Sequence, residues 1–463
     1  MAIGSVMTLS KLKQYALQLA ALTADVMLFP FLLVGVICVG GARLWWAWLQ
    51  RKKTFRPATI PTLLAVQPGL INAYRLQGEE IISYFTSPVA SEVHILDPYA
   101  DKDEEFSPLP GIRIVGWRTP RLFIGMQALG MRESPFPLRE LMTTLRMLNY
   151  VTDKGVFCIR SMQHANSALC AGLVSAALNV PHVIEIAGNY EMLRRIWGWP
   201  FYFQWFGRIP GLRIVFRACN DALLGWPIKH AFCVIGRNKN NYEHAFALGA
   251  PVERLTMIRI HLATSFLNLE QRPAPLAGRY MLFVARITTE KFPLDVVSVF
   301  AILADRYPDL SLVVIGDGIL LPEVKRQVAG MACKERVHIL GNQPYDEVIQ
   351  WTRGAAIAFE TYSGSALAEK MICNVPVVAY DVEWMAEVVI DSFSGKLVRF
   401  RDIDAAAQAC SELLDDPQEA RRLAEMGQKL AIAMFDNETI TRKENAIFSS
   451  ALDHVKENYG MAQ

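Results

Sequence analysis

The stretch YMLFVARITTEKFPLDVVSVFAILADRYPDLSLVVIG, residues 280–316, decides the fold of the C-terminal half. It passes from a short apolar run through a segment with helical spacing, 292–306, to a second apolar run. This order is typical of a strand, a helix and a parallel strand. Similar units follow as far as the run VPVVAYD at 375–381. The C-terminal half is therefore predicted to be a doubly wound α/β domain.

The same alternation begins upstream, at residue 57, and predicts a second domain of the same class. The fold class is thus α/β, with two Rossmann-like doubly wound domains. We expect the first domain at 57–270 and the second at 271–445, with a helix or tail at 446–463. The expected strands are 62–67, 92–97, 112–117, 156–160, 182–187 and 231–236, then 280–285, 310–316, 337–341, 355–360, 375–381 and 395–400.

The N-terminus predicts a membrane anchor. Residues 26–42 carry no charge, and apolar character continues to residue 49 through a tryptophan-rich stretch. About 20 apolar residues suffice to span a bilayer, and tryptophans suit its interface. A basic cluster follows, which favours a cytoplasmic location for the rest of the chain. We expect 1–56 to anchor the protein in the inner or plasma membrane, by spanning it or by lying in its surface.

Composition excludes several classes of function. The formal net charge of the 463 residues is +2, so nucleic acid is not an expected partner. The eight cysteines form no C-x-x-C pair, which argues against a zinc or redox site. One D-x-D, Asp101 to Asp103, lies in the acidic run ADKDEE, where a solvated loop is the simpler interpretation. No metal site is expected.

FVARITTEKFPLD, residues 283–295, is the sharpest signal for chemistry. Arg286 lies just beyond a strand, and Lys291 lies at the start of the next helix. Ligands of open α/β sheets bind outside the carboxyl ends of the strands. Both cations are therefore placed to bind a phosphate group and to stabilise charge on a departing diphosphate. The alternative is that both side chains are solvated.

A glycine turn follows the next strand. VVIGDG brings Gly316, Asp317 and Gly318 to the strand's end, and glycine permits close approach of a ligand to the backbone. A dinucleotide fingerprint would need a third glycine where Leu321 stands, which argues against a nicotinamide or flavin cofactor.

A third segment, AFETYSGSALAEK at 358–370, predicts a strand, a turn and a helix that begins near a phosphate. Glu360, at the strand tip, is placed to face the transferred sugar, and Glu369, within the helix, to accept hydroxyls of a ribose. The alternative is a helix capped by serine, with solvated glutamates. The turn and the helix start contribute Ser363, Gly364, Ser365 and Ala366 to the predicted donor site.

From about residue 230 to 445 the sequence resembles the family 4 retaining glycosyltransferases of the GT-B fold. Arg286 and Lys291 match the family's diphosphate-binding pair, Gly316–Gly318 its glycine turn, and Glu369 the glutamate that holds the ribose. The resemblance implies two domains that face a cleft, no cofactor, and a UDP- or GDP-sugar donor. With the anchor, it implies a membrane-associated acceptor such as a lipid-linked saccharide or polysaccharide.

The sequence departs from the family's pattern at the glutamate pair. Glu360 and Glu369 enclose eight residues rather than the usual seven, and strict spacing would put Thr361 in the first site. The choice between Glu360 and Thr361 stays open. A catalytically inactive membrane subunit of the same fold is the alternative function. In the first domain, only position at strand tips suggests acceptor or sugar contacts, at Arg160, His164, Glu185 and Glu191.

Overall fold

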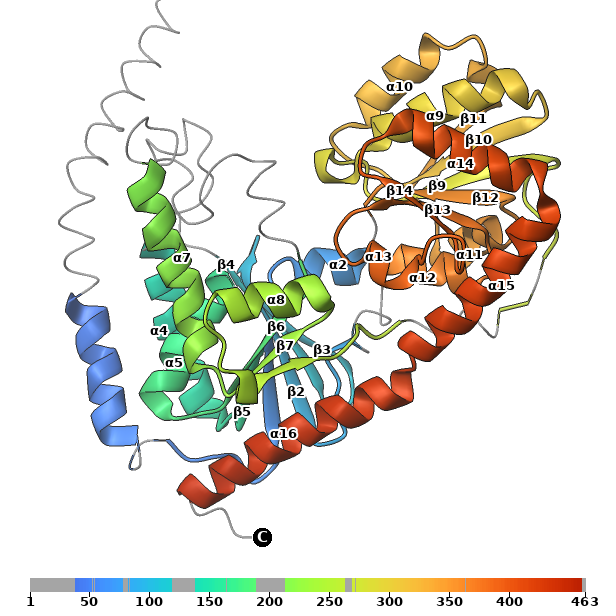
Figure 1. Ribbon diagram of the computed structural model, residues 1–463. Helices are drawn as coiled ribbons and strands as arrows, with labels where there is room; N and C mark the ends of the chain where they lie inside the picture. The colour runs from blue at the N-terminus through green and yellow to red at the C-terminus, as the bar shows by residue number, and fades with distance from the viewer. Residues whose placement is uncertain are drawn as a thin grey trace, which may run out of the picture.

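The computed structural model describes residues 38–51, 53, 55–77, 82, 84–118, 138–163, 165–188, 213–262, 269–270, 272–362 and 364–459. They form two α/β domains and a long C-terminal helix that returns from the second domain to the first (Figure 1). The predicted α/β class with two doubly wound domains is confirmed.

The first domain is built on an eight-stranded sheet in the order β3-β4-β2-β1-β5-β6-β7-β8, parallel except for the β3–β4 pair. The strands are β1 (Thr62–Val66), β2 (Glu92–Ala100), β3 (Glu104–Leu109), β4 (Ile112–Arg118), β5 (Cys158–Ser161), β6 (His182–Ile186), β7 (Cys233–Gly236) and β8 (Leu255–Met257). The helices are α2 (Leu70–Gln77), α4 (Leu138–Lys154), α5 (Asn166–Leu178), α7 (Arg213–His230) and α8 (Lys239–Ala247).

Alternation along β1 places its apolar side chains on both faces of this sheet. Leu63 and Ala65 belong to one buried cluster, and Leu64 and Val66 to another. Both faces are therefore covered, as a parallel sheet requires. The six predicted strands are present. Two further strands, β3 and β8, were not predicted from the sequence. β3 is a polar edge strand without an apolar run, and β8 has only three residues.

The second domain has a six-stranded parallel sheet in the order β11-β10-β9-β12-β13-β14. Its strands are β9 (Arg279–Val284), β10 (Leu310–Ile315), β11 (Val337–Gly341), β12 (Ile357–Glu360), β13 (Val377–Asp381) and β14 (Lys396–Arg399). Its helices are α9 (Pro293–Arg306), α10 (Leu321–Ala329), α11 (Tyr345–Arg353), α12 (Ser365–Ile372), α13 (Met385–Val388), α14 (Ile403–Asp415) and α15 (Pro417–Met434). All six predicted strands are present here.

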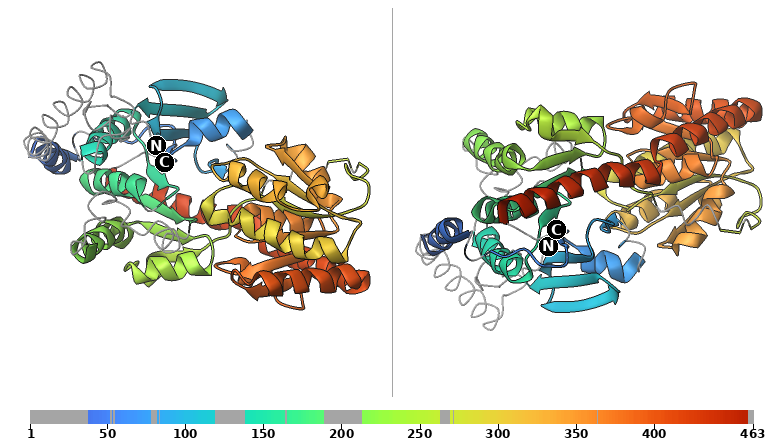
Figure 2. Two further views of the ribbon diagram at one scale, coloured as in Figure 1. Left: turned by 90° about the horizontal axis from the view of Figure 1, so that it is seen from above. Right: turned by 90° about the horizontal axis from the view of Figure 1, so that it is seen from below.

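The C-terminal helix α16 (Asn437–Tyr459) belongs to the first domain by its packing. Its Phe448, Ala451 and Val455 lie in the same buried cluster as Leu63 of β1. Figure 2, seen from below, shows α16 running beneath the first domain from the side of the second. The expected end of the second domain at residue 445 therefore falls inside one continuous helix, whose apolar face completes the core of the first domain.

Residues 38–51 are helical and present a tryptophan-rich surface. Trp45 and Trp46 are 62% and 60% exposed, while Leu44 and Ala47 pack against the first domain. Within the described residues, none of the helices combines the length and apolarity needed to cross a bilayer. Residues 26–37 of the predicted apolar run 26–49 lie outside the described residues.

Candidate functional site

The predicted donor-site residues gather at one edge of the second sheet. Strands β9, β10, β12 and β13 are parallel, so their carboxyl ends meet at the same edge. The loops after these strands carry Arg286 with Lys291, the turn at 316–318, Tyr362 with Gly364, and Glu383. This is the edge at which ligands of open α/β sheets bind.

Arg286 and Lys291 differ in their exposure. The Arg286 side chain is 75% exposed, and its Nη2 lies 3.6 Å from Oε1 of Glu290. Lys291 ends a short 3₁₀ turn (Thr289–Lys291), and its Nζ lies 4.7 Å from the centre of the Tyr362 ring. Burial, and then the nearby Arg286 charge, lower the pKa of Lys291 from 10.5 to about 8. The structure thus brings the two cations together, with one of them partly desolvated.

The backbone around Lys291 holds it in place. Phe292 has a φ of 46°, which directs the chain into Pro293 at the start of α9. The carbonyl of Lys291 accepts a hydrogen bond of 2.5 Å from the buried Thr361 hydroxyl. The loop after β9 is therefore attached to the loop after β12.

The glycine turn attaches the loop after β10 to the loop after β9. Gly316 and Gly318 have φ values of 133° and 158°, and a Cβ on Gly316 would lie 1.9 Å from the Ala285 carbonyl oxygen. The amide of Ile287 donates to the carbonyl of Asp317 at 2.9 Å. Close packing of two loops thus requires glycine here, whether or not a ligand approaches. The Asp317 side chain is exposed beside this turn.

The position of Glu360 differs from the prediction that it faces the transferred sugar. Its side chain is 1% exposed, and its Oε1 lies 2.5 Å from Nζ of Lys370, which is equally buried. Lys370 points inward from α12 and neutralises the carboxylate, so Glu360 does not face a sugar. Thr361 is also fully buried. Neither side chain is therefore exposed at the strand tip.

The start of α12 carries backbone amides that no described side chain caps. Gly364 is the N-cap residue and is exposed, and no side chain of the described residues caps the helix. Uncapped amides at a helix N-terminus favour anions. Ser365 and Ala366 form the first turn, and Glu369 lies one turn further, half-buried. Ser363 lies outside the described residues.

Glu383 was missed by the sequence reading. It follows β13, and the Tyr362 hydroxyl donates a hydrogen bond to its carboxylate. Burial raises the pKa of Glu383 from 4.5 to about 7, although Tyr362 and Lys291 oppose this rise. The signal was present in the sequence, because Glu383 is a carboxylate just beyond the end of a predicted strand.

Two of the four predicted acceptor residues of the first domain, Arg160 and Glu185, do not reach an open surface. Arg160 and Glu185 are fully buried and form an ion pair with each other. Arg160 Nη2 also lies 3.4 Å from Oε2 of Glu444 on α16. Their burial contradicts the expected contact with an acceptor and assigns them to the attachment of α16. His164 and Glu191 lie outside the described residues.

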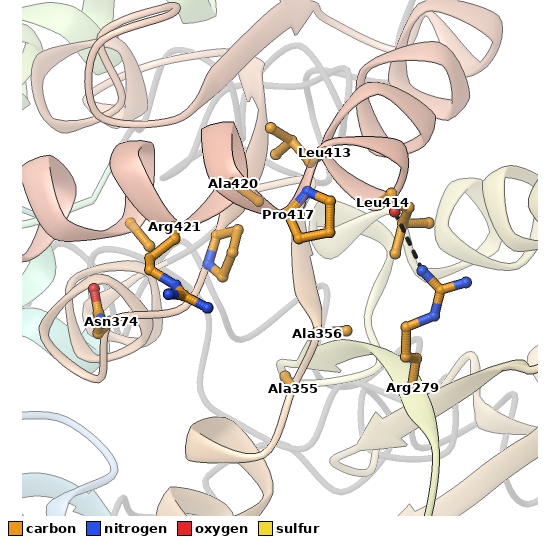
Figure 3. A pocket seen from close by; sticks show the side chains of 11 residues that line it. Arg279, Ala355, Ala356, Asn374, Leu413, Leu414, Pro417, Ala420 and Arg421 are labelled. Carbon is orange, nitrogen blue, oxygen red and sulfur yellow. Dashed lines mark hydrogen bonds between the residues drawn. The ribbon is translucent and has the colours of Figure 1, made fainter.

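A cavity of about 350 Å³ lies at the opposite edge of the second sheet (Figure 3). Arg279 begins β9, and Ala355 and Ala356 precede β12, so this cavity is at the amino ends of the strands. The candidate site is at the carboxyl ends. The two are therefore separate features of the domain.

A model of the family described as "Glycosyl transferases group 1" matches residues 267–430, which cover most of the second domain. The chain is 25% identical to the alpha-D-kanosaminyltransferase of Streptomyces kanamyceticus, over 48% of this chain and 62% of the relative. It is 30% identical to the GDP-mannose-dependent alpha-(1-6)-phosphatidylinositol monomannoside mannosyltransferase of Mycolicibacterium smegmatis, over 28% of this chain and 37% of that protein. The chain thus spans less than two thirds of the length of these relatives. The family model thus supports the glycosyl transferases group 1 family for residues 267–430, and both relatives are named as transferases of sugars.

The crystal structure of Anabaena Alr3699/HepE in complex with UDP has the same architecture. It aligns with a TM-score of 0.63 at 15% identity, over 84% of this chain and 100% of that one. Identity this low establishes the fold alone. The chain accordingly has the two-domain GT-B type of fold.

Proposed function

We propose that the chain transfers a sugar from a nucleotide-sugar donor to a membrane-associated acceptor, without a metal ion and with retention of configuration. The observation that carries this proposal is the pairing of Arg286 and Lys291 near the start of α12, which no side chain of the described residues caps. These groups lie within the segment that matches the family model. Two cations and a set of backbone amides are suited to one diphosphate.

In this mechanism the second domain binds the donor. Arg286 and Lys291 hold the diphosphate, and Glu369 accepts the hydroxyls of the ribose. Negative charge grows on the diphosphate as its bond to the sugar breaks, so both cations stabilise the transition state more than the ground state. In this proposal the charge of the diphosphate is compensated by the side chains of Arg286 and Lys291. Retention of configuration follows from the family resemblance.

We further propose that the N-terminal segment attaches the protein to the inner or plasma membrane, with both domains in the cytoplasm. The exposed tryptophans of the helix at 38–51, with Arg51 close behind, support this arrangement. An acceptor carried by a membrane, such as a lipid-linked saccharide or polysaccharide, is then within reach of the first domain.

A subunit of this fold without turnover is the second candidate. The pairing of Glu360 with Lys370 favours it, since the first motif glutamate is then not available to a ligand. A binding assay does not separate the two candidates, because an inactive subunit can retain its nucleotide site. A turnover assay does.

The experiment uses the detergent-purified full chain with UDP, UDP-glucose, GDP and GDP-mannose. We expect either UDP and UDP-glucose or GDP and GDP-mannose to raise the melting temperature of the protein. The nucleotide sugar of that pair should be hydrolysed, or its sugar transferred to an acceptor. Arg286→Ala should weaken nucleotide binding by roughly 10- to 100-fold, the value of one charge-assisted hydrogen bond. The matched control is Arg326→Ala on α10, another exposed arginine, 73% accessible, with an ion pair on its own helix. Equal affinities in the two variants would contradict the assigned site, and binding without turnover would favour the inactive subunit.

A further inference from the structure

The candidate site has no free carboxylate at the strand tip where the sequence predicts one. Glu360 ends β12, but Lys370 neutralises it within the protein core, with 2.5 Å between Nζ and Oε1. A carboxylate bound in this way is not available to a ligand, because breaking the buried ion pair would leave an uncompensated charge in the core at a large cost in free energy. Another residue must supply the oxygen if the site contacts a sugar through a carboxylate.

Glu383 presents a carboxylate at the neighbouring strand. β13 pairs with β12, and Glu383 lies in the loop between β13 and α13. Tyr362 donates a hydrogen bond to Glu383 and lies under the Nζ of Lys291, 4.7 Å from its ring centre. The charge of Lys291 also acts directly on Glu383. Glu383 therefore lies beside the cation to which the proposed function assigns the diphosphate.

Two features of Glu383 are unfavourable for folding. Its φ is 54°, a left-handed conformation that glycine adopts freely and other residues adopt at a cost. Its Oε1 is buried without a hydrogen-bond partner among the described residues. Burial also holds its pKa at about 7. Strained backbone and unsatisfied polar atoms concentrate at ligand sites, where a bound group satisfies them.

We propose that Glu383 binds a hydroxyl group of the donor's sugar through this unpartnered Oε1. A sugar hydroxyl is a suitable donor for a carboxylate oxygen, and the sugar is joined to the diphosphate that Lys291 would bind. The inference rests on the proposed function, since the sugar is present only when the donor is. Glu383 is then a sugar-binding residue that takes the place of Glu360.

The test measures dissociation constants by calorimetry for a nucleotide and its sugar conjugate, using UDP with UDP-glucose and GDP with GDP-mannose. Glu383→Gln keeps the size of the side chain, and Glu383→Gly relieves the backbone strain. Both variants should weaken binding of the nucleotide sugar by about tenfold or more, and should keep the dissociation constant of the free nucleotide within about twofold of wild type. Glu383→Gly should not lower the melting temperature. An unchanged melting temperature would show that the loss of nucleotide-sugar affinity does not come from unfolding.

Asn374→Gly is the matched control. Asn374 is exposed, has a φ of 61°, and lies beside the cavity at the opposite edge of the sheet. This substitution should leave both affinities unchanged. If the Glu383 variants change the dissociation constants of the nucleotide and of its sugar conjugate by the same factor, or change neither constant, the inference is wrong while the proposed function stands. If the wild-type chain binds none of the four compounds, the proposed function fails and the role of Glu383 fails with it.

Discussion

Glu444 on α16 lies 2.8 Å from Nη2 of Arg237, the residue that follows β7. Arg160 of β5 and His261 beyond β8 approach the same carboxylate, at 3.4 and 3.3 Å. Burial opposes ionisation of Glu444, but Arg160, His261 and Arg237 together hold its pKa well below the usual range. Glu444 of the returning helix thus shares with Glu185 of β6 the compensation of two buried arginines at the carboxyl edge of the first sheet.

Glu444→Gln should destabilise the protein by about 3–5 kcal/mol, because it leaves buried guanidinium charge uncompensated. Urea denaturation measures the change, and Glu457→Gln, an exposed glutamate on the same helix, should stay within about 0.5 kcal/mol of wild type. The folded pKa of Glu444 is depressed from 4.5, so its contribution is present above pH 4.5 and is lost as the pH falls further. A midpoint unchanged in Glu444→Gln would mean that α16 is held by apolar packing alone.

The buried pair of Glu360 and Lys370 should respond differently to single and double substitution. Glu360→Gln alone leaves Lys370 without its partner and should cost about 3–5 kcal/mol. Glu360→Leu combined with Lys370→Met replaces the pair with apolar side chains and should recover most of that loss. Thermal and urea unfolding of Glu360→Leu and Lys370→Met, each alone and combined, measure the coupling. Additive losses in the double variant would argue that the two residues do not act as a pair.

Nucleotide binding should weaken above pH 8. The pKa of Lys291 is about 8 in the free protein, so its charge is lost as the pH rises through that value. A diphosphate binds the charged form, and its affinity should therefore fall by up to about tenfold per pH unit between pH 8 and 10. Calorimetry at a series of pH values measures this slope. Lys291→Arg keeps its charge throughout and should flatten the profile; a slope that persists in this variant would point to another group.

The glycines of the site should separate folding from binding. Gly316→Ala brings a Cβ to 1.9 Å from a backbone oxygen and should cost at least about 2 kcal/mol of stability. A Cβ on Gly364 meets nothing within 4 Å, so Gly364→Ala should fold normally. Gly364→Ala should still weaken nucleotide binding, because the new methyl group lies at the N-cap of α12, beside the amides proposed to bind the phosphate. Unchanged binding in this variant would move the phosphate away from that helix.

The tryptophans of the N-terminal helix should contribute to membrane attachment. Replacing Trp45, Trp46 and Trp48 with serine removes three side chains that are 62%, 60% and 46% exposed, so the fold should be little affected. Co-sedimentation with vesicles of anionic lipid should fall. Substituting Val252 and Met257, exposed apolar residues elsewhere in the first domain, is the control and should leave sedimentation unchanged. Equal sedimentation of both variants would place the attachment in another segment.

The order of strands and helices, and the placement of the two cations, could be read from the sequence. Short apolar runs separated by helical spacing determine a parallel sheet, and a residue just beyond a strand must lie at the sheet's carboxyl edge. Arg286 and Lys291 follow from this local geometry. Strands β3 and β8 could not be predicted in this way, because one is polar and at an edge and the other has three residues.

The partners of the buried charges were decided by the tertiary structure. Arg160 contacts Glu444, a residue 284 positions away, and that contact changes a predicted acceptor residue into part of the domain's core. Lys370 likewise removes Glu360 from the site, while the packing of β13 beside β12 brings Glu383 to Lys291 and Tyr362. The physical reason is that periodicity along the chain specifies which face a residue occupies. The contacts on that face depend on which distant segments pack there.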